Sequence, residues 1–411
     1  MNEATWNYVR QHADEDVRKL ALQGVKDADV DLQMALQQIA GRQTAGRKLP
    51  SWAAVDGIIY PPHLNMEQCS SEQTARYKAK IAGEGDSMVD LTGGFGVDFY
   101  WISQGFQHRQ YIEQNEELCA ISSHNFEVLG LDSIVNCCDA VTYLTTMPHV
   151  DLIYLDPARR NEHGGRTYGI ADCTPNVLEL QSLLMEKADR VMLKLSPMLD
   201  WRKAVEDLKY VTEVHIVSVD NECKELIVEM RNEKGNFATP HSDLSEKVRI
   251  ICVNLHSDGS EELFGFEYPS PSHLLTFSPP HLLTSSPSHF LYEPNASMMK
   301  AGCFTEVEER FPVRQIAPNS HLFLSDVEIE DFPGRKFQIL AISSMNKQDI
   351  KKYFSEFLVS MKSANIAVRN FPLTVEQLRK KLKLKDGGDT YIFATTTTDG
   401  AHRLFICRKI G

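Results

Sequence analysis

The stretch Asp90-Leu-Thr-Gly-Gly-Phe-Gly-Val-Asp98 decides the fold of this chain. It follows the short apolar run Ser87-Met-Val-Asp-Leu91 and precedes an amphipathic segment, so the sequence predicts a strand, a glycine turn and a helix. Glycine suits such a turn because the backbone must bend tightly and let a ligand approach without a Cβ in the way. The stretch therefore predicts a site for a nucleotide-type cofactor.

Two common nucleotide motifs fit this stretch poorly. A dinucleotide site has the pattern Gly-x-Gly-x-x-Gly, but Phe99 stands where the third glycine belongs after Gly94 and Gly96. A P-loop needs Gly-Lys-Ser/Thr after the turn, and Val97-Asp98 excludes it. What is left is an acidic residue, Asp90, four positions before a Gly-x-Gly.

The rest of the first half alternates apolar runs with segments of helical length. The runs that we interpret as strands after the first one are 108–113, 133–138, 150–155, 190–195, 213–218 and 224–229. The last two are close enough to form a hairpin, which predicts an antiparallel final strand beside an otherwise parallel sheet. Acidic residues end or follow three of these runs: Glu113, Asp139 and Asp156. They would gather with Asp90 at the carboxyl edge of the sheet, where open α/β sheets bind ligands.

This arrangement resembles the class I S-adenosylmethionine-dependent methyltransferases, whose first motif has the spacing of Asp90, Gly94 and Gly96. The resemblance implies a seven-stranded Rossmann-like α/β sheet with S-adenosylmethionine as cofactor. Glu113, seventeen residues past Gly96, is then the carboxylate that holds the ribose hydroxyls, and Asp139 reaches the adenine amino group. The cofactor-binding residues that it implies are Asp90, Thr92, Gly94, Gly96, Glu113, Gln114, Asp139 and Ala140. Thr74 and Lys78 join them, because a capped helix starting at Ser70 or Ser71 would close over the methionine end.

The sequence Asp156-Pro157-Ala158-Arg159 bears on the reaction, and we expect these four residues to form the catalytic motif. Enzymes of this class that methylate base amines usually have Asp/Asn/Ser-Pro-Pro-aromatic here, with the aromatic ring stacked on the base. This chain lacks the ring, although an arginine plane can stack on a base or clamp a phosphate. The motif also resembles that of RNA 5-methyluridine enzymes, but their cysteine nucleophile has no counterpart in Leu195-Ser-Pro-Met198, and Cys173 belongs elsewhere in the fold. Direct transfer to a nitrogen, with Asp156 orienting the acceptor, is the better hypothesis.

The later part of the chain resembles a bacterial group of these enzymes that has a C-terminal THUMP-like domain. The resembling stretches are Tyr292–Ala296, Val368–Leu373, Leu378–Gly388 and Tyr391–Thr395. The sequence predicts a helical cap over residues 1–50, the methyltransferase domain over 51–232, a small ferredoxin-like or hairpin-rich connecting domain over 233–330, and a small basic α+β domain over 331–411. The connecting domain contains the repeat Ser270-Pro-Ser-His, Ser278-Pro-Pro-His, Ser286-Pro-Ser-His, which we interpret as an extended connector and not as a metal site.

Charge is segregated along the chain. Residues 331–411 contain fifteen Lys/Arg and seven Asp/Glu, a net charge of +8, whereas the whole chain has −13. The basic residues concentrate in one short stretch, where a solvated helix end and an RNA-docking surface both remain open as interpretations. The residues that we expect to contact RNA are Arg160, Arg379, Lys380, Lys381, Lys383 and Lys385.

Composition is that of an ordinary soluble protein: 42% of the residues are hydrophobic and 24% are charged, and no run approaches a membrane span. Nine cysteines without Cys-x-x-Cys spacing predict reduced thiols in the cytoplasm and no structural metal. The expected partner is a structured RNA such as tRNA or rRNA, with no DNA and no membrane. A protein that binds cofactor and RNA without turnover, and an enzyme with a small-molecule or protein acceptor, stay open as alternatives.

Overall fold

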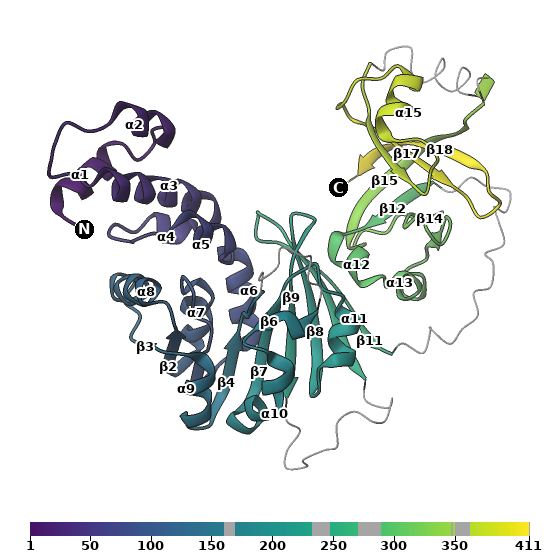
Figure 1. Ribbon diagram of the computed structural model, residues 1–411. Helices are drawn as coiled ribbons and strands as arrows, with labels where there is room; N and C mark the ends of the chain where they lie inside the picture. Colours follow the sequence, from purple (N-terminus) through teal and green to yellow (C-terminus); the bar gives the residue numbers. More distant parts are fainter. Residues whose placement is uncertain (160–168, 232–246, 270–288, 347, 350–361, 411) are drawn as a thin grey trace. The chain divides into compact units, whose positions relative to one another are not determined.

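The computed structural model describes residues 1–159, 169–231, 247–269, 289–346, 348–349 and 362–410 (Figure 1). Two compact units divide the chain: the first contains residues 1–219 and 224–248, and the second contains 220–223 and 249–411. The Ser/Pro/His repeat up to position 288 and Arg160 lie outside the described residues.

Helices open the chain, as the spacing of its apolar residues predicts. They are α1 (Glu3–Gln11), α2 (Val17–Gln23), α3 (Leu32–Lys48), α4 (Pro50–Ala53), α5 (His63–Gln68) and α6 (Glu72–Ala82). Val9, Leu20, Ala35 and Ile39 form one buried cluster between the first three helices. Ser71 caps α6 by accepting a hydrogen bond from the backbone of Thr74 at 3.3 Å, so the helix starts where the capping signal predicts.

A large sheet forms the centre of the methyltransferase-like part. Its strands are β1 (Gly85–Asp90), β2 (Phe106–Glu113), β3 (Ile134–Cys137), β4 (Val150–Leu155), β7 (Ala188–Leu195), β8 (Val211–Val219), β9 (Glu222–Arg231), β10 (Val248–Leu255) and β11 (Glu261–Tyr268). The strand order is β11-β10-β8-β9-β7-β4-β1-β2-β3. The pairs β1–β2, β1–β4, β2–β3 and β4–β7 are parallel, and β7–β9 is antiparallel, as the sequence predicts for the final strand.

The expected count of seven strands was wrong, because the sheet has nine. The seven predicted runs are all strands, and the hairpin of β10 and β11 extends the sheet beyond β8. The sequence signal for that hairpin, two apolar runs flanking Ser257-Asp-Gly259, is local and does not say which strand edge it pairs with.

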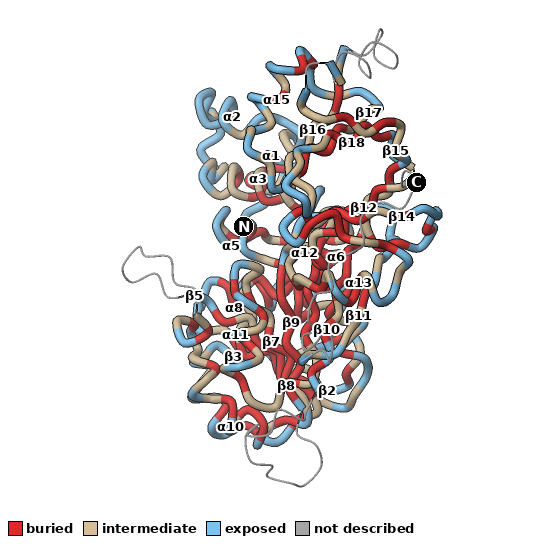
Figure 2. Tube along the Cα trace, turned by 90° about the vertical axis from the view of Figure 1, so that its right-hand side faces the viewer, coloured by how far each residue is buried: buried red, intermediate tan, exposed pale blue. Residues whose placement is uncertain are grey.

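Helices connect the parallel strands. They are α7 (Val97–Ile102), α8 (Glu116–Val128), α9 (Ala140–Thr146), α10 (Val177–Lys187) and α11 (Trp201–Asp207). Helix α6 packs on α7, and α9 packs on α10. The central strands β4, β7 and β9 are mostly buried, as Figure 2 shows for β7 and β9. Because parallel strands all end at the same edge, this arrangement brings the residues that follow β1, β2, β3 and β4 to one side of the sheet.

The second unit contains a seven-stranded sheet in the order β13-β14-β12-β15-β18-β17-β16. Its strands are β12 (Phe290–Pro294), β13 (Arg314–Gln315), β14 (Phe323–Ser325), β15 (Gly334–Ser344), β16 (Asn365–Arg369), β17 (Thr390–Thr396) and β18 (His402–Ile410). Among its described residues are the helices α12 (Ala296–Ala301), α13 (Phe304–Arg310) and α15 (Val375–Leu382). The sequence Thr374-Val-Glu-Gln377 has the capping-box pattern, and Thr374 and Gln377 form that capping box at the start of α15. The expected small α+β C-terminal domain is confirmed.

In the parts of the chain that the structure covers, no helix is long and apolar enough to cross a membrane. None of the nine cysteines, all of them within the described residues, forms a disulfide. Among the same residues, no group of three or more His, Cys, Asp or Glu side chains is placed to hold a metal ion.

Candidate active site

The glycine turn between β1 and α7 has the geometry that its sequence predicts. Gly94 has φ +56° and Gly96 has φ +80°, a region that favours glycine. A Cβ on Gly93 would lie 2.1 Å from the ring of Tyr111, and one on Gly96 would lie 2.6 Å from that of Phe126. Packing therefore requires glycine at two of these positions, and backbone conformation requires it at Gly94 and Gly96.

Gly94 faces open space, in contrast to its neighbours. The nearest atom to a Cβ built there is the carbonyl oxygen of Thr92 at 3.8 Å. The loop thus leaves room beside its own backbone, which is the kind of cradle in which the main chain approaches a ligand closely. Gly94 donates its N–H to Oε2 of Glu113 at 2.9 Å, which fixes that carboxylate beside the cradle.

Glu113 ends β2 and is half-buried. Its second oxygen, Oε1, accepts the N–H of Asn115 at 2.8 Å. A carboxylate has about four lone-pair sites, so two are left after these bonds. Gln114 is exposed in the same turn. Glu113 can therefore hold two hydroxyl groups of a ligand lying over the glycine loop.

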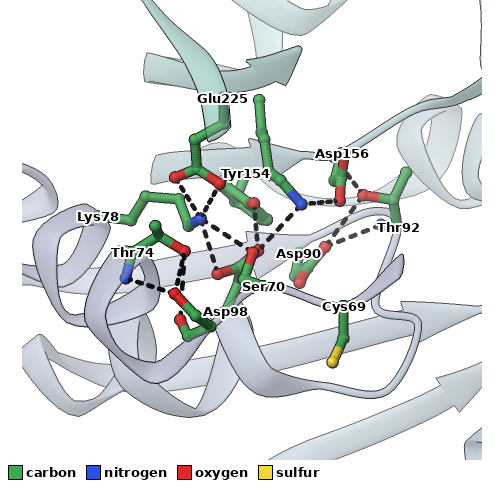
Figure 3. A network of polar contacts seen from close by, with 12 residues as sticks. Cys69, Ser70, Thr74, Lys78, Asp90, Thr92, Asp98, Tyr154, Asp156 and Glu225 are labelled. Carbon is green, nitrogen blue, oxygen red and sulfur yellow. Dashed lines mark hydrogen bonds and ion pairs between the residues drawn. The ribbon is translucent and has the colours of Figure 1, made fainter. Parts of the chain in front are cut away.

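Asp90 lies at the end of β1 and is 1% exposed. Burial raises its pKa well above the ordinary value for an aspartate, although the backbone N–H of Thr92, at 2.9 Å from Oδ1, opposes that shift. The hydroxyl of Thr92 also contacts Asp90, at 3.4 Å, and accepts the N–H of Asp156 at 2.6 Å (Figure 3). Thr92 thus joins the glycine loop to the start of the Asp-Pro-Ala-Arg motif.

Asp139 is exposed and caps α9, of which Ala140 is the first residue. Its carboxylate accepts hydrogen bonds from the N–H and the hydroxyl of Thr142, both at 2.8 Å. These bonds lower its pKa, the backbone bond most. The structure therefore gives Asp139 a local role as a helix cap, at the edge where a ligand contact is expected.

The four residues of the Asp-Pro-Ala-Arg motif follow β4. Asp156 has a side chain that is 38% exposed, and Oδ2 accepts a hydrogen bond from Lys194 at 2.5 Å. Pro157 is buried and Ala158 is exposed. Ala158 and Arg159 form the short strand β5 (Ala158–Arg159), which pairs with β6 (Cys173–Thr174), so that Cys173 lies opposite Arg159.

Cys173 is thus nearer to the motif than the sequence indicates, but its side chain is 3% exposed. It also follows β4 and not β7, which is where the methyluridine enzymes carry their nucleophile. Burial keeps this thiol from an incoming base.

Thr74 and Lys78, expected beside the cofactor, are both buried in α6. The ammonium group of Lys78 is paired with Glu225, at 2.7 and 2.9 Å, with Asp98 at 3.1 Å and with Ser70 at 3.0 Å. A lysine with all its donors occupied inside the protein holds elements together. Lys78 therefore has a structural role, in which it joins α6 to α7 and β9, in place of the cofactor contact that we expected.

Lys194 and Asp98 are the site residues that the sequence analysis missed. Lys194 lies between Asp156 at 2.5 Å and Asp98 at 3.8 Å, and Asp98 also accepts the hydroxyls of Ser70 and Tyr154, both at 2.7 Å. One signal was available: Lys194 interrupts the apolar run Val191–Leu195 of a strand that is covered on both faces. A lysine in such a strand requires buried acidic partners.

The basic stretch of the second unit is partly available to a ligand. Lys380, Lys381, Lys383 and Lys385 are exposed on and after α15. Arg379 is half-buried and paired with Asp386 at 2.7 Å. Four of the five expected contacts therefore face solvent.

Comparisons with known proteins bear on both units. A crystal structure from Porphyromonas gingivalis W83, described as a candidate methyltransferase, is 31% identical to this chain, with 99% of this chain and 98% of that one covered and a TM-score of 0.85. Two other structures are more distant, and both are named as candidates. One is a class I S-adenosylmethionine-dependent methyltransferase from Listeria monocytogenes, with 10% identity, 62% of this chain and 94% of that one covered, and a TM-score of 0.37. The other is an RNA methyltransferase from Pyrococcus horikoshii, with 16% identity, 46% of this chain and 95% of that one covered, and a TM-score of 0.34. At these TM-scores neither supports a further argument.

Two family models match the second unit: a ferredoxin-like domain over residues 290–333 and a THUMP domain-like model over 334–409. None of the curated proteins matches. The Porphyromonas relative spans essentially the whole chain with the same fold, and the glycine loop has the expected geometry. The chain therefore belongs to the same methyltransferase family as the Porphyromonas relative, with a THUMP-like domain at its C-terminal end.

Proposed function

We propose that this protein transfers a methyl group from S-adenosylmethionine to a base nitrogen in RNA. The observation that carries the proposal is the hydroxyl of Thr92, which contacts Asp90 on one side and the backbone N–H of Asp156 on the other. It joins the loop suited to the cofactor directly to the motif suited to the acceptor. Such a connection fixes donor and acceptor relative to each other, which is the main requirement for a transfer reaction.

The cofactor would lie over Gly94 and Gly96, with its ribose hydroxyls on Glu113. The room beside Gly94 and the two lone-pair sites left on Glu113 support this placement. Gln114 follows β2, and Asp139 and Ala140 follow β3, at the edge of the sheet where the adenine is expected. The cofactor supplies an activated methyl group on a sulfonium, so the protein needs little acid–base chemistry.

Asp156 would accept a hydrogen bond from the acceptor amine. The nitrogen lone pair forms the new bond to the methyl carbon while the sulfur–carbon bond breaks and leaves its electron pair on sulfur. One amine proton then passes to water. The partial exposure of Asp156 lets its carboxylate reach an incoming base, and its loop is held by Thr92.

RNA as the acceptor is supported by the second unit. The exposed lysines 380, 381, 383 and 385 form a concentrated positive surface on a chain that is acidic overall. Positive side chains that contact phosphates supply most of the sequence-independent affinity for nucleic acid. We propose that this surface docks the RNA.

Asp156→Ala tests the acceptor assignment. Methyl transfer should fall below detection while the affinity for S-adenosylmethionine, measured by calorimetry, stays within a few-fold. Cys173→Ser is the companion variant and should transfer at close to the parent rate, because the direct reaction uses no thiol. Equal loss of transfer and cofactor affinity in Asp156→Ala would remove Asp156 from the acceptor site, and loss of transfer in Cys173→Ser would favour covalent carbon methylation.

A further inference from the structure

Lys194 is a charged residue in the interior of the large sheet. It lies in β7, its side chain is 12% exposed, and its ammonium group is 2.5 Å from Oδ2 of Asp156. Burying a lysine costs stability unless it is paired. Its partner, Asp156, is the residue proposed to orient the acceptor, so Lys194 contacts a proposed catalytic residue directly.

A second carboxylate holds Lys194 from the other side. Oδ2 of Asp98 is 3.8 Å from its ammonium group, and Asp98 is fixed by Lys78, Ser70 and Tyr154 (Figure 3). Lys78 in turn pairs with Glu225 of β9. These contacts anchor Lys194 through groups from α6, α7, β4 and β9, so its position does not depend on Asp156 alone.

The neighbouring carboxylates also keep the side chain of Lys194 protonated. Burial alone would lower its pKa, but the carboxylates of Asp156 and Asp98 outweigh burial and raise the pKa above the ordinary value for a lysine. The pKa of Asp98 is lowered, because Lys78 and Lys194 outweigh the effect of its burial. Lys194 is therefore a fixed cation near neutral pH and has no role as a proton acceptor.

We propose that Lys194 is a positioning residue for methyl transfer, which occupies Oδ2 of Asp156 and so turns Oδ1 toward the acceptor. This inference rests on the proposed function. Two hydrogen bonds define the orientation of Asp156. Its backbone N–H donates to the hydroxyl of Thr92 at 2.6 Å, and its Oδ2 accepts from the ammonium group of Lys194. Within the described residues, no hydrogen bond occupies Oδ1. That oxygen is thus held in place and available for an amine N–H.

Without Lys194, the partly exposed carboxylate of Asp156 would be free to turn and to bind water with both oxygens. Misplacing an acceptor group by about 1 Å can cost about 100-fold in rate. The cofactor cradle would be unaffected, because Glu113 and Gly94 contact neither Lys194 nor Asp156. Removal of Lys194 should therefore lower kcat and leave cofactor binding intact.

The test compares Lys194→Met, Lys194→Arg and a double-mutant cycle with Asp156→Asn in the full-length protein. We expect Lys194→Met to lower kcat about 100-fold, with the Kd for S-adenosylmethionine within threefold and a folded thermal transition. Lys194→Arg keeps a cation and should recover part of the rate. The variant with both Lys194→Met and Asp156→Asn should be no slower than Asp156→Asn alone, because Lys194 acts through Asp156.

Lys203→Met is the matched control, since Lys203 is 60% exposed on α11 and pairs only with Asp207 among the contacts described. It should behave as the parent. If Lys194→Met does not fold, Lys194→Gln provides a polar side chain without the charge and replaces it in the cycle. Additive losses in the cycle, or an unchanged kcat in the single variant, would overturn the proposal. If the parent protein labels no acceptor, the proposed function fails and this inference fails with it, whereas an active parent with an additive cycle refutes the inference alone.

Discussion

Replacing Glu113 with glutamine tests the cofactor site at its most constrained residue. The carboxylate already accepts the backbone N–H of Gly94 at 2.9 Å and of Asn115 at 2.8 Å. Two of its four or so lone-pair sites are then left for the ribose. Every acceptor position on this side chain thus has an expected partner.

Glutamine has nearly the same shape, but it is neutral and carries an NH₂ group in place of one oxygen. Whichever way the amide turns, that group faces either Gly94 or Asn115 and cannot accept. One backbone N–H therefore loses its partner, and one ribose hydroxyl can no longer donate to a carboxylate oxygen. A hydrogen bond to a charged group contributes about 1.5–3 kcal/mol. The variant should therefore bind S-adenosylmethionine about 10- to 150-fold more weakly than the parent.

The assay is calorimetric titration of each protein with S-adenosylmethionine, alongside a thermal melt to show that the variant is folded. Glu117→Gln provides the control, because Glu117 is an exposed residue in the first turn of α8 and undergoes the same chemical change nearby. Its Kd should match that of the parent. A folded Glu113→Gln variant whose Kd stays within twofold of the parent would refute the assignment of Glu113 to the ribose.

The glycine loop, the buried Asp90 and the lysines of the second unit give three further expected outcomes. Gly96→Ala forces a Cβ to 2.6 Å from Phe126 at φ +80°, so it should lower the free energy of unfolding, measured in urea, by about 1–3 kcal/mol. The control is Gly46→Ala in α3, which has nothing within 4 Å of its Cβ and should be neutral or stabilising. Equal effects of the two substitutions would contradict the packing argument. Burial raises the pKa of Asp90 in the folded state, so ionisation of this side chain destabilises the fold as pH rises through that pKa. Asp90→Asn should therefore raise the Tm, by more at pH 8 than at pH 5. A Tm difference between variant and parent that does not change with pH would contradict this explanation. Reversing the charge of Lys380, Lys381 and Lys383 together should weaken RNA binding. It should also reduce the slope of log K against log salt by about 0.7 for each single-strand phosphate that the variant no longer neutralises. Filter binding at several salt concentrations measures both quantities, and no change in either would make this stretch an ordinary solvated surface.

The framework of the large sheet could be predicted from the sequence because its signals are local. The seven apolar runs, the glycines and the capping residues of α6 and α15 each depend on a few neighbouring residues, and each lies where predicted. The carboxylates Asp90, Glu113, Asp139 and Asp156 could be placed at one edge because parallel strands end together. The hairpin 248–268 has a local signal, but its pairing with the edge of the large sheet has none, so the expected sheet was two strands too small.

The partners of the buried charges could not be predicted, since they come from distant parts of the chain. Lys78 and Glu225 are 147 residues apart, and Lys194 in β7 is 38 residues from Asp156, which follows the neighbouring strand β4. A sequence shows that a lysine stands in an apolar run, but not which carboxylate faces it. For the same reason Lys78 was interpreted as a ligand, and the pairing of Arg379 with Asp386 was not foreseen.

The most direct test of the central claim is methyl transfer from tritiated S-adenosylmethionine into total RNA from cells lacking this protein, with a protein extract labelled in parallel. RNase and protease digests identify the labelled polymer, and Asp156→Ala serves as the inactive control. The account predicts label that RNase releases and that the control lacks. Label confined to the protein extract, or no label in either pool from a protein that binds the cofactor, would contradict it.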